Sequence, residues 1–195
     1  MTKEFGNFTT LESLHQWLLT INFDLDRWSS GQAKSVKNLF NEIVTGESSI
    51  QLQPPLRVVK VVQVLVRNAD KFLLELGQEL DDKRLRKRKI PPSEKLKPGE
   101  DCLIAARRCL VEELQIQPDK IILLTEQCKP VYRYRNSRSY PGLRTKYVVY
   151  RVEVIIKDLP SSDFWTDEKS NQGTQEIIRR HFWGWRTLKK IKYPD

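Results

Sequence analysis

One segment of the chain decides how the fold is interpreted, and from Pro91 to Ile116 it reads PPSEKLKPGEDCLIAARRCLVEELQI. A helix is predicted from about Gly99 or Glu100 to Leu114, because apolar residues recur there at helical spacing. Pro118 cannot extend this helix, since proline has no amide proton to donate. The segment therefore places several charged residues, two adjacent glutamates among them, on one helix.

The spacing of the charged residues in this segment resembles the Nudix box. In that motif a glycine and five residues precede a glutamate, and seven residues later follows Arg-Glu-aliphatic-x-Glu-Glu-x-Gly-aliphatic. Glu100 takes the first glutamate position and Arg108 the arginine position. The other residues that match in register are Leu110, Glu112, Glu113 and Ile116. The resemblance to the Nudix hydrolase superfamily extends over residues 55–193, with a degenerate box at residues 94–116.

Three positions depart from the motif. Glu94 replaces the opening glycine, so a side chain stands where the backbone would approach a ligand. Gln115 replaces the late glycine, which costs little because it only fits less well at a helix end. Cys109 replaces the glutamate that in the family binds metal and often activates water. This last departure matters most, because a thiol is a poor ligand for magnesium.

The resemblance implies a divalent metal and a hydrolytic site on this helix. Water attacks a negatively charged diphosphate linkage slowly unless the charge is neutralised and the water activated. The expected catalytic residues are Glu112, Glu113 and Arg108, with Cys109 in place of the expected glutamate. Glu112, Glu113 and Glu100 are expected to hold Mg²⁺ or Mn²⁺ weakly. Two alternatives stay open: a further acid such as Glu153 or Glu168 completes the site, or the paired glutamates are a solvated helix end.

The composition describes a globular chain with excess positive charge. Of the 195 residues 39% are hydrophobic and 30% charged, and the formal net charge is +9. No apolar run approaches the ~20 residues of a membrane span, and the first residues lack the apolar block of a signal peptide. The charge favours an anionic partner, whether nucleotide, nucleic acid or acidic protein surface. Cys102, Cys109 and Cys128 have no metal spacing, which suggests reduced thiols and a cytoplasmic location.

The first part of the chain, residues 1–53, is predicted to be a helical extension and linker. One helix is expected to begin at a capping pair of Thr9 and Glu12, and a second to run from Gln32 to Thr45 and end at Gly46. About 45 residues rarely bury enough surface to fold alone, so this helical pair is expected to pack on the rest of the protein.

Residues 54–195 are predicted to form the Nudix-like domain. Strands at Leu56–Arg67 and Lys71–Leu80 form a hairpin across the turn signal Asn68-Ala-Asp70. The later elements expected are strands at Ile121–Glu126, Val131–Arg135 and Lys146–Lys157 and a short helix at Thr187–Ile191. The fold class is therefore α+β, a Nudix-like mixed sheet sandwiched by helices with the helical pair packed on it.

Three further segments carry candidate binding residues. Arg138, Tyr140 and Arg144 belong to a turn rich in aromatic and guanidinium groups, which suits stacking on a base and pairing with a phosphate. The basic run from Arg84 to Lys89 is interpreted as an exposed edge strand, with phosphate or RNA binding as the alternative. His181 is interpreted as packing among aromatic residues, with a general-base role as the alternative.

Three functions remain in competition. The favoured one is a Nudix-fold protein that binds a nucleotide or a nucleoside-diphosphate-linked compound, with weak or absent divalent-dependent pyrophosphohydrolase activity. The second is an active, divergent Nudix hydrolase of nucleoside diphosphate derivatives. The third is a basic RNA- or protein-binding module within an assembly. None of the three places the protein in a membrane.

Overall fold

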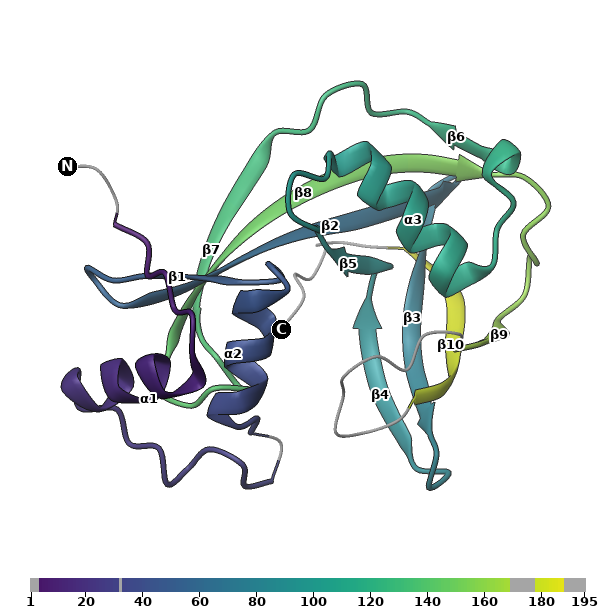
Figure 1. The fold of residues 1–195 in the computed structure, drawn as a ribbon. Helices are drawn as coiled ribbons and strands as arrows, with labels where there is room; N and C mark the ends of the chain where they lie inside the picture. The colour runs from purple at the N-terminus through teal and green to yellow at the C-terminus, as the bar shows by residue number, and fades with distance from the viewer. Residues whose placement is uncertain (1–3, 32, 169–177, 188–195) are drawn as a thin grey trace.

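The computed structural model describes residues 4–31, 33–168 and 178–187, which form a curved mixed β-sheet with three α-helices (Figure 1). The helices are α1 (Leu11–Thr20), α2 (Val36–Val44) and α3 (Cys102–Leu114). The strands are β1 (Ser49–Gln51), β2 (Leu56–Asn68), β3 (Lys71–Leu80), β4 (Leu85–Ile90), β5 (Ser93–Lys95), β6 (Ile121–Leu123), β7 (Pro130–Asn136), β8 (Arg144–Ile156), β9 (Phe164–Asp167) and β10 (Ile178–Thr187). The predicted α+β class with a mixed sheet is confirmed.

The sheet consists of two arms that meet at a hairpin. In one arm β2 and β8 run parallel, from Arg57 opposite Thr145 to Val66 opposite Val154. The predicted β2–β3 hairpin is present, but its strands pair only next to the turn, at Asn68 and the residue before it. Beyond that point β3 pairs with β4 and β10 in the second arm, which turns steeply away from the first (Figure 1). The basic run forms most of β4, which pairs with β3 alone among the described strands and so lies at an edge of this second arm, as predicted.

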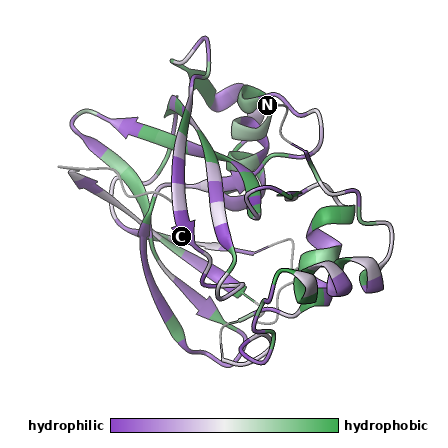
Figure 2. Ribbon diagram, turned by 90° about the vertical axis from the view of Figure 1, so that its left-hand side faces the viewer, coloured by the Kyte–Doolittle hydropathy of each residue, from purple (hydrophilic) through white to green (hydrophobic). Residues whose placement is uncertain are grey.

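Helix α3 packs with one face on the arm formed by β2 and β8. The buried residues of the shared core come from α3 (Ala105, Ala106, Cys109, Leu110, Leu114), β2 (Val62, Val64, Val66), β8 (Val152, Val154, Ile156) and their surroundings (Leu73, Leu96, Ile121, Trp183). Strand β2 is apolar and buried along most of its length, and the strands and helices together carry both apolar and polar residues (Figure 2). Full burial of one such aliphatic side chain contributes roughly 1.5–3 kcal/mol to folding, so this interface fixes the orientation of α3.

The N-terminal helices pack on the opposite end of β2. Helix α1 begins one residue later than predicted, because Thr10 and Ser13 form the capping box in place of Thr9 and Glu12. Helix α2 begins at Val36 after the cap Ser35, whereas the predicted start, Gln32, lies outside the described residues. A second core joins the helices to the rest of the chain and contains Leu14, Leu18, Trp28, Leu39, Ile50, Tyr140 and Leu143. The predicted packing of the helical pair on the domain is present, while the boundary at residues 53 and 54 stays a prediction.

The expectation of reduced cysteines is wrong. Cys102, the first residue of α3, forms a disulfide with Cys128, and Cys109 is the free, buried thiol. Sequence spacing excluded only the pair on α3, and the partner is brought close by the fold across a separation of 26 residues. The predicted cytoplasmic location rested on reduced thiols, so it loses that support.

Two other expectations concern where individual elements end. Strand β6 ends at Leu123, three residues earlier than expected, and Thr187 ends β10. The short helix predicted from Thr187 otherwise lies outside the described residues. Among residues that are described, no helix has the length and apolar character needed to cross a membrane.

Candidate functional site

Helix α3 carries the degenerate box and is anchored at both ends. Asp101 caps its N-terminus, where the carboxylate accepts a hydrogen bond of 2.7 Å from the amide of Leu103. Gln115 ends it in the left-handed conformation (φ 57°), which a glycine would adopt with less strain. The Gln115 side chain donates to the carbonyl of Asp167 at 3.0 Å, which ties the end of the helix to β9.

Cys109 lies on the buried face of α3. Its side chain is fully inaccessible and packs in the core with β2 and β8. Burial, with the charges of Glu113 and Glu94, raises the pKa of the Cys109 thiol well above its usual range. The group at this position is therefore neutral, and it offers no ligand to a hard cation.

Arg108 of α3 binds two carboxylates, Glu100 in the loop before the helix and Glu112 one turn further along it. Its Nε and one terminal nitrogen each lie 2.9 Å from an oxygen of Glu100, and its other terminal nitrogen lies 3.1 Å from Glu112. It also donates to the carbonyl of Lys95 at 2.8 Å. The hydrogen bond from Arg108 lowers the pKa of Glu100, whose two oxygens are both occupied.

Glu113 belongs to a different cluster from its neighbour Glu112. Its carboxylate lies 3.5 Å from Nδ1 of His181, which in turn lies 2.6 Å from Glu75. The other ring nitrogen of His181 contacts Glu168 at 2.8 Å. The three predicted metal ligands, Glu100, Glu112 and Glu113, are therefore not directed to one point, and they do not fit a shared magnesium ion as they stand.

The buried cluster around His181 has strongly perturbed ionisation. Burial raises the pKa of Glu113 to about 8. The charges of Glu75, Glu94 and Glu168 also raise this pKa, whereas the charge of His181 lowers it. Burial alone would lower the pKa of His181, but the hydrogen bond to Glu75 and the charge of Glu113 outweigh it and raise that pKa to about 9. Perturbed groups of this kind concentrate at functional sites.

The sequence interpretation found this cluster only in part. Of the two further acids that the sequence offers, Glu168 contacts His181, whereas Glu153 on β8 is not part of the cluster. The sequence predicts a packing role for His181 and assigns none to Glu75. The available signal for Glu75 was its place in the middle of an apolar strand, where an unpaired carboxylate would be costly.

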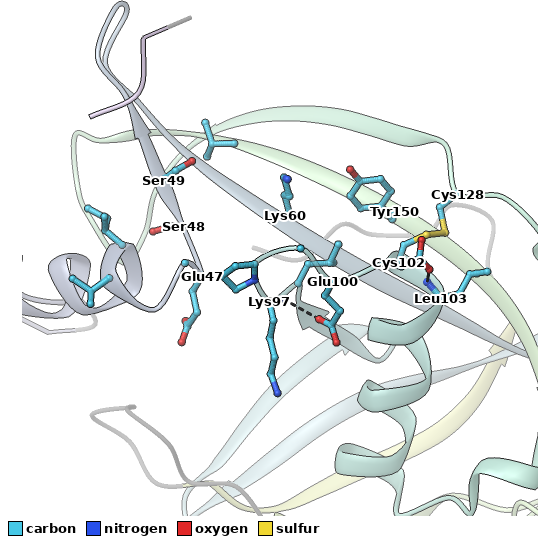
Figure 3. Close-up of a pocket in the computed structure, with 18 of the residues that line it drawn as sticks. Glu47, Ser48, Ser49, Lys60, Lys97, Glu100, Cys102, Leu103, Cys128 and Tyr150 are labelled. Carbon is cyan, nitrogen blue, oxygen red and sulfur yellow. Dashed lines mark hydrogen bonds between the residues drawn. A yellow bond between two sulfur atoms is a disulfide. The ribbon is translucent and has the colours of Figure 1, made fainter. Parts of the chain in front are cut away.

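A cleft of about 900 Å³ opens at the N-terminal end of α3 (Figure 3). Lys60 of β2 and Tyr150 of β8 lie on its floor, on the same face of the sheet. The segment after α2, including Glu47, forms one wall, and the loop before α3 forms the other. The disulfide between Cys102 and Cys128 lies at the edge (Figure 3).

The charges around this cleft leave two cations, Lys60 and Lys97, without an ion pair among the described residues. Glu47 is bound by Lys95 at 2.6 Å, and Glu100 by Arg108. Within the described part of the chain Lys60 makes no ion pair, so its ammonium group is available to an anion. Glu126 and Asp101 also line the cleft and form no ion pair among those residues.

The predicted ligand residues of the 138–144 turn do not line this cleft. Tyr140 is fully buried, with its ring 5.1 Å from that of Trp28 in the N-terminal core. Arg138 and Arg144 are exposed, and Arg144 lies over the ring of Tyr134 at 5.5 Å. Arg144 instead borders a smaller hollow of about 310 Å³ formed with the segment before β2.

The chain is an α+β arrangement in which helix α3, whose sequence resembles a degenerate Nudix box, packs on a curved mixed sheet. Solved structures similar to this chain are a NUDIX hydrolase from Nitrosomonas europaea (19% identity, 64% of this chain and 71% of that chain, TM-score 0.39), a C. elegans Ap4A hydrolase (20%, 66% and 79%, 0.33) and the E. coli dihydroneopterin triphosphate pyrophosphohydrolase (18%, 67% and 80%, 0.36). No protein family and no curated protein matches the sequence. These similarities are weak and assign no function to this chain.

Proposed function

We propose that this protein binds a nucleotide or a nucleoside-diphosphate-linked compound in the cleft at the N-terminal end of α3, with weak or absent divalent-dependent pyrophosphohydrolase activity. The proposal rests on one observation, that the residues at the metal-binding positions of the box have different surroundings and partners. Cys109 is buried and neutral, Glu112 is held by Arg108, and Glu113 contacts His181. The carboxylates that would hold a metal against a diphosphate therefore do not act together.

The binding part of the proposal rests on the floor of the cleft. Its volume of about 900 Å³ is that of a small-molecule site. Lys60 supplies a positive charge without a carboxylate partner among the described residues, and the half-buried ring of Tyr150 lies beside it on β8. A phosphate at Lys60 with a base near Tyr150 uses both groups.

Binding is tested by the melting temperature of the protein with a panel of nucleoside mono-, di- and triphosphates. A ligand of the folded state raises the melting temperature by mass action. Lys60→Ala should remove most of the shift, whereas Lys71→Ala, an exposed lysine on β3, should leave it unchanged. The proposal fails if no compound shifts the wild-type protein, or if both variants respond alike.

Turnover is tested by product release from the same compounds with Mg²⁺ or Mn²⁺. Glu112→Gln combined with Glu113→Gln is the control. We expect weak release or none above that control. Rapid release that vanishes in the double variant would favour the active, divergent hydrolase, with the missing carboxylate supplied from elsewhere.

One observation favours the alternative of an RNA-binding module. Tyr132 and Tyr134 of β7 are about half exposed, and Lys146 and Arg144 of β8 lie over their rings at 4.4 and 5.5 Å. Aromatic and cationic groups on an exposed strand suit stacking on bases. Binding of single-stranded RNA that weakens steeply with salt and is lost in Tyr132→Ala with Tyr134→Ala would support that function.

A further inference from the structure

We propose that Glu75, Glu113 and His181 bind a divalent transition-metal ion of the Zn²⁺ type, at a site distinct from the nucleotide cleft. The site uses the last glutamate of the box, but its other two ligands come from β3 and β10 of the second arm. Cys102 at the cleft and Glu113 are eleven positions apart on α3, or about 16 Å along the helix axis. The inference therefore does not depend on nucleotide binding.

The three ligand atoms already converge. One atom from each residue lies within 4.8 Å of the others, and Nδ1 of His181 is 2.6 Å from Glu75 and 3.5 Å from Glu113. A tetrahedral ion with bonds of roughly 2.0–2.2 Å holds its ligand atoms about 3.4 Å apart. The distance between the Glu75 oxygen and Nδ1 of His181 would have to grow by less than about 1 Å for the ion to fit.

The histidine ring is oriented as a metal ligand usually is. Its Nε2 lies 2.8 Å from Glu168, so that carboxylate can accept the proton of Nε2 and leave the lone pair of Nδ1 toward Glu75 and Glu113. The ring of Trp183 stacks against it at 5.8 Å between centroids. A carboxylate behind a metal-binding histidine is the arrangement that fixes the tautomer in many metal sites.

A second partner also fixes the orientation of Glu75. Nε of Arg88 lies 2.8 Å from one of its oxygens, which leaves the other oxygen for the site. The side chains of Glu75 and His181 are 5% and 2% exposed, whereas that of Glu113 is 20% exposed. An ion therefore reaches the site past Glu113, and a water molecule can occupy its fourth position.

The ligand set selects the metal. Magnesium prefers oxygen ligands and an octahedral shell, whereas an imidazole nitrogen favours zinc and other late first-row ions. Two carboxylates and one imidazole thus point to Zn²⁺, with Co²⁺ as its spectroscopic substitute. The competing arrangement is an imidazolium that bridges the carboxylates with no metal.

The test is a titration of the chelator-treated full-length protein with Zn²⁺ and Mg²⁺ by calorimetry and with Co²⁺ by visible absorption. We expect one Zn²⁺ per chain, bound at least about a hundredfold more tightly than Mg²⁺. Co²⁺ should give ligand-field bands without the charge-transfer band that a thiolate ligand would add. Absence of saturable binding, or equal affinity for Zn²⁺ and Mg²⁺, would overturn the proposal and favour the bridging imidazolium.

Variants provide a second test because the chain has two histidines. His181→Ala and Glu113→Gln should abolish the Co²⁺ bands, while His15→Ala and Glu112→Gln should retain them. Glu168→Gln should weaken Zn²⁺ by about 10–100-fold, as loss of a partner behind the ligand does. If His181→Ala does not fold, Glu113→Gln still decides, since that side chain is partly exposed. Unchanged Co²⁺ bands in Glu113→Gln would contradict the assignment.

Discussion

Arg108 and Glu100 form a two-point ion pair, with Nε and one terminal nitrogen each 2.9 Å from a different carboxylate oxygen. The residues stand eight positions apart, in the loop before α3 and on the helix itself. The pair occupies both oxygens of a glutamate that the sequence assigned to metal binding. Its role in this chain is to hold the loop at the cleft against α3.

Loss of this pair should destabilise the protein. Arg108→Ala removes the hydrogen-bonded partner of Glu100, whose side chain is 9% exposed, and should reduce the free energy of unfolding by about 1–3 kcal/mol. Urea denaturation measures the change. Arg107→Ala is the matched control, because within the described residues that arginine makes only contacts of 3.4 and 3.5 Å to carbonyl oxygens. Equal effects of the two substitutions would contradict the role given to the pair.

Restoring the glutamate of the motif should not restore a working site. Cys109→Glu places a carboxylate in the buried core of α3, and it should reduce the free energy of unfolding by more than about 2 kcal/mol. Denaturant unfolding measures the cost, and Cys109→Ser is the control for loss of the thiol alone. Hydrolysis by a Cys109→Glu protein of wild-type stability would show instead that position 109 turns toward the ligand.

The N-terminal helices should loosen at low pH through Glu42 of α2. Burial would raise the pKa of Glu42, but Arg57, Lys95 and Lys34 outweigh it and lower that pKa to about 2. A depressed carboxyl pKa stabilises the folded state above its unfolded value of about 4.5 and loses that contribution as pH falls toward 2. The loss should approach about 3 kcal/mol.

The measurement for Glu42 is the free energy of unfolding as a function of pH. The slope between pH 4.5 and 2 should be shallower in Glu42→Gln than in the wild-type protein. Glu12→Gln, at an exposed position of α1, is the control and should retain the wild-type slope. Parallel curves for wild type and Glu42→Gln would contradict the assignment.

Reduction of the disulfide should weaken both the fold and the cleft. Cys102 and Cys128 close a loop with a sequence separation of 26, which corresponds to about 3.5 kcal/mol of unfolding free energy. Both residues line the cleft, so bound nucleotide should dissociate more readily after reduction. Thermal unfolding with and without a dithiol reductant measures the first effect. In Cys102→Ser with Cys128→Ser the reductant should change nothing further.

Local patterns in the sequence were sufficient for the elements around the box. The predicted helix ends at Leu114, as α3 does, because the apolar repeat and Pro118 both act within a few residues. The strand from Lys71 to Leu80 was predicted with its observed bounds, since the turn at Asn68 and the following alternation are local signals. The α+β class follows from the order of such elements.

Only the tertiary structure decided which side chains meet. His181 and Glu75 are 106 positions apart, and their contact depends on the pairing of β10 with β3. Tyr140 belongs to a turn with the composition of a binding loop, yet its side chain is buried against the N-terminal helices. Periodicity reveals that a residue lies on one face of a helix or strand, but not what covers that face. The sequence therefore determined the helices, the strands and the degenerate box. Packing between distant segments decided that Glu112 contacts Arg108 while its neighbour Glu113 contacts His181.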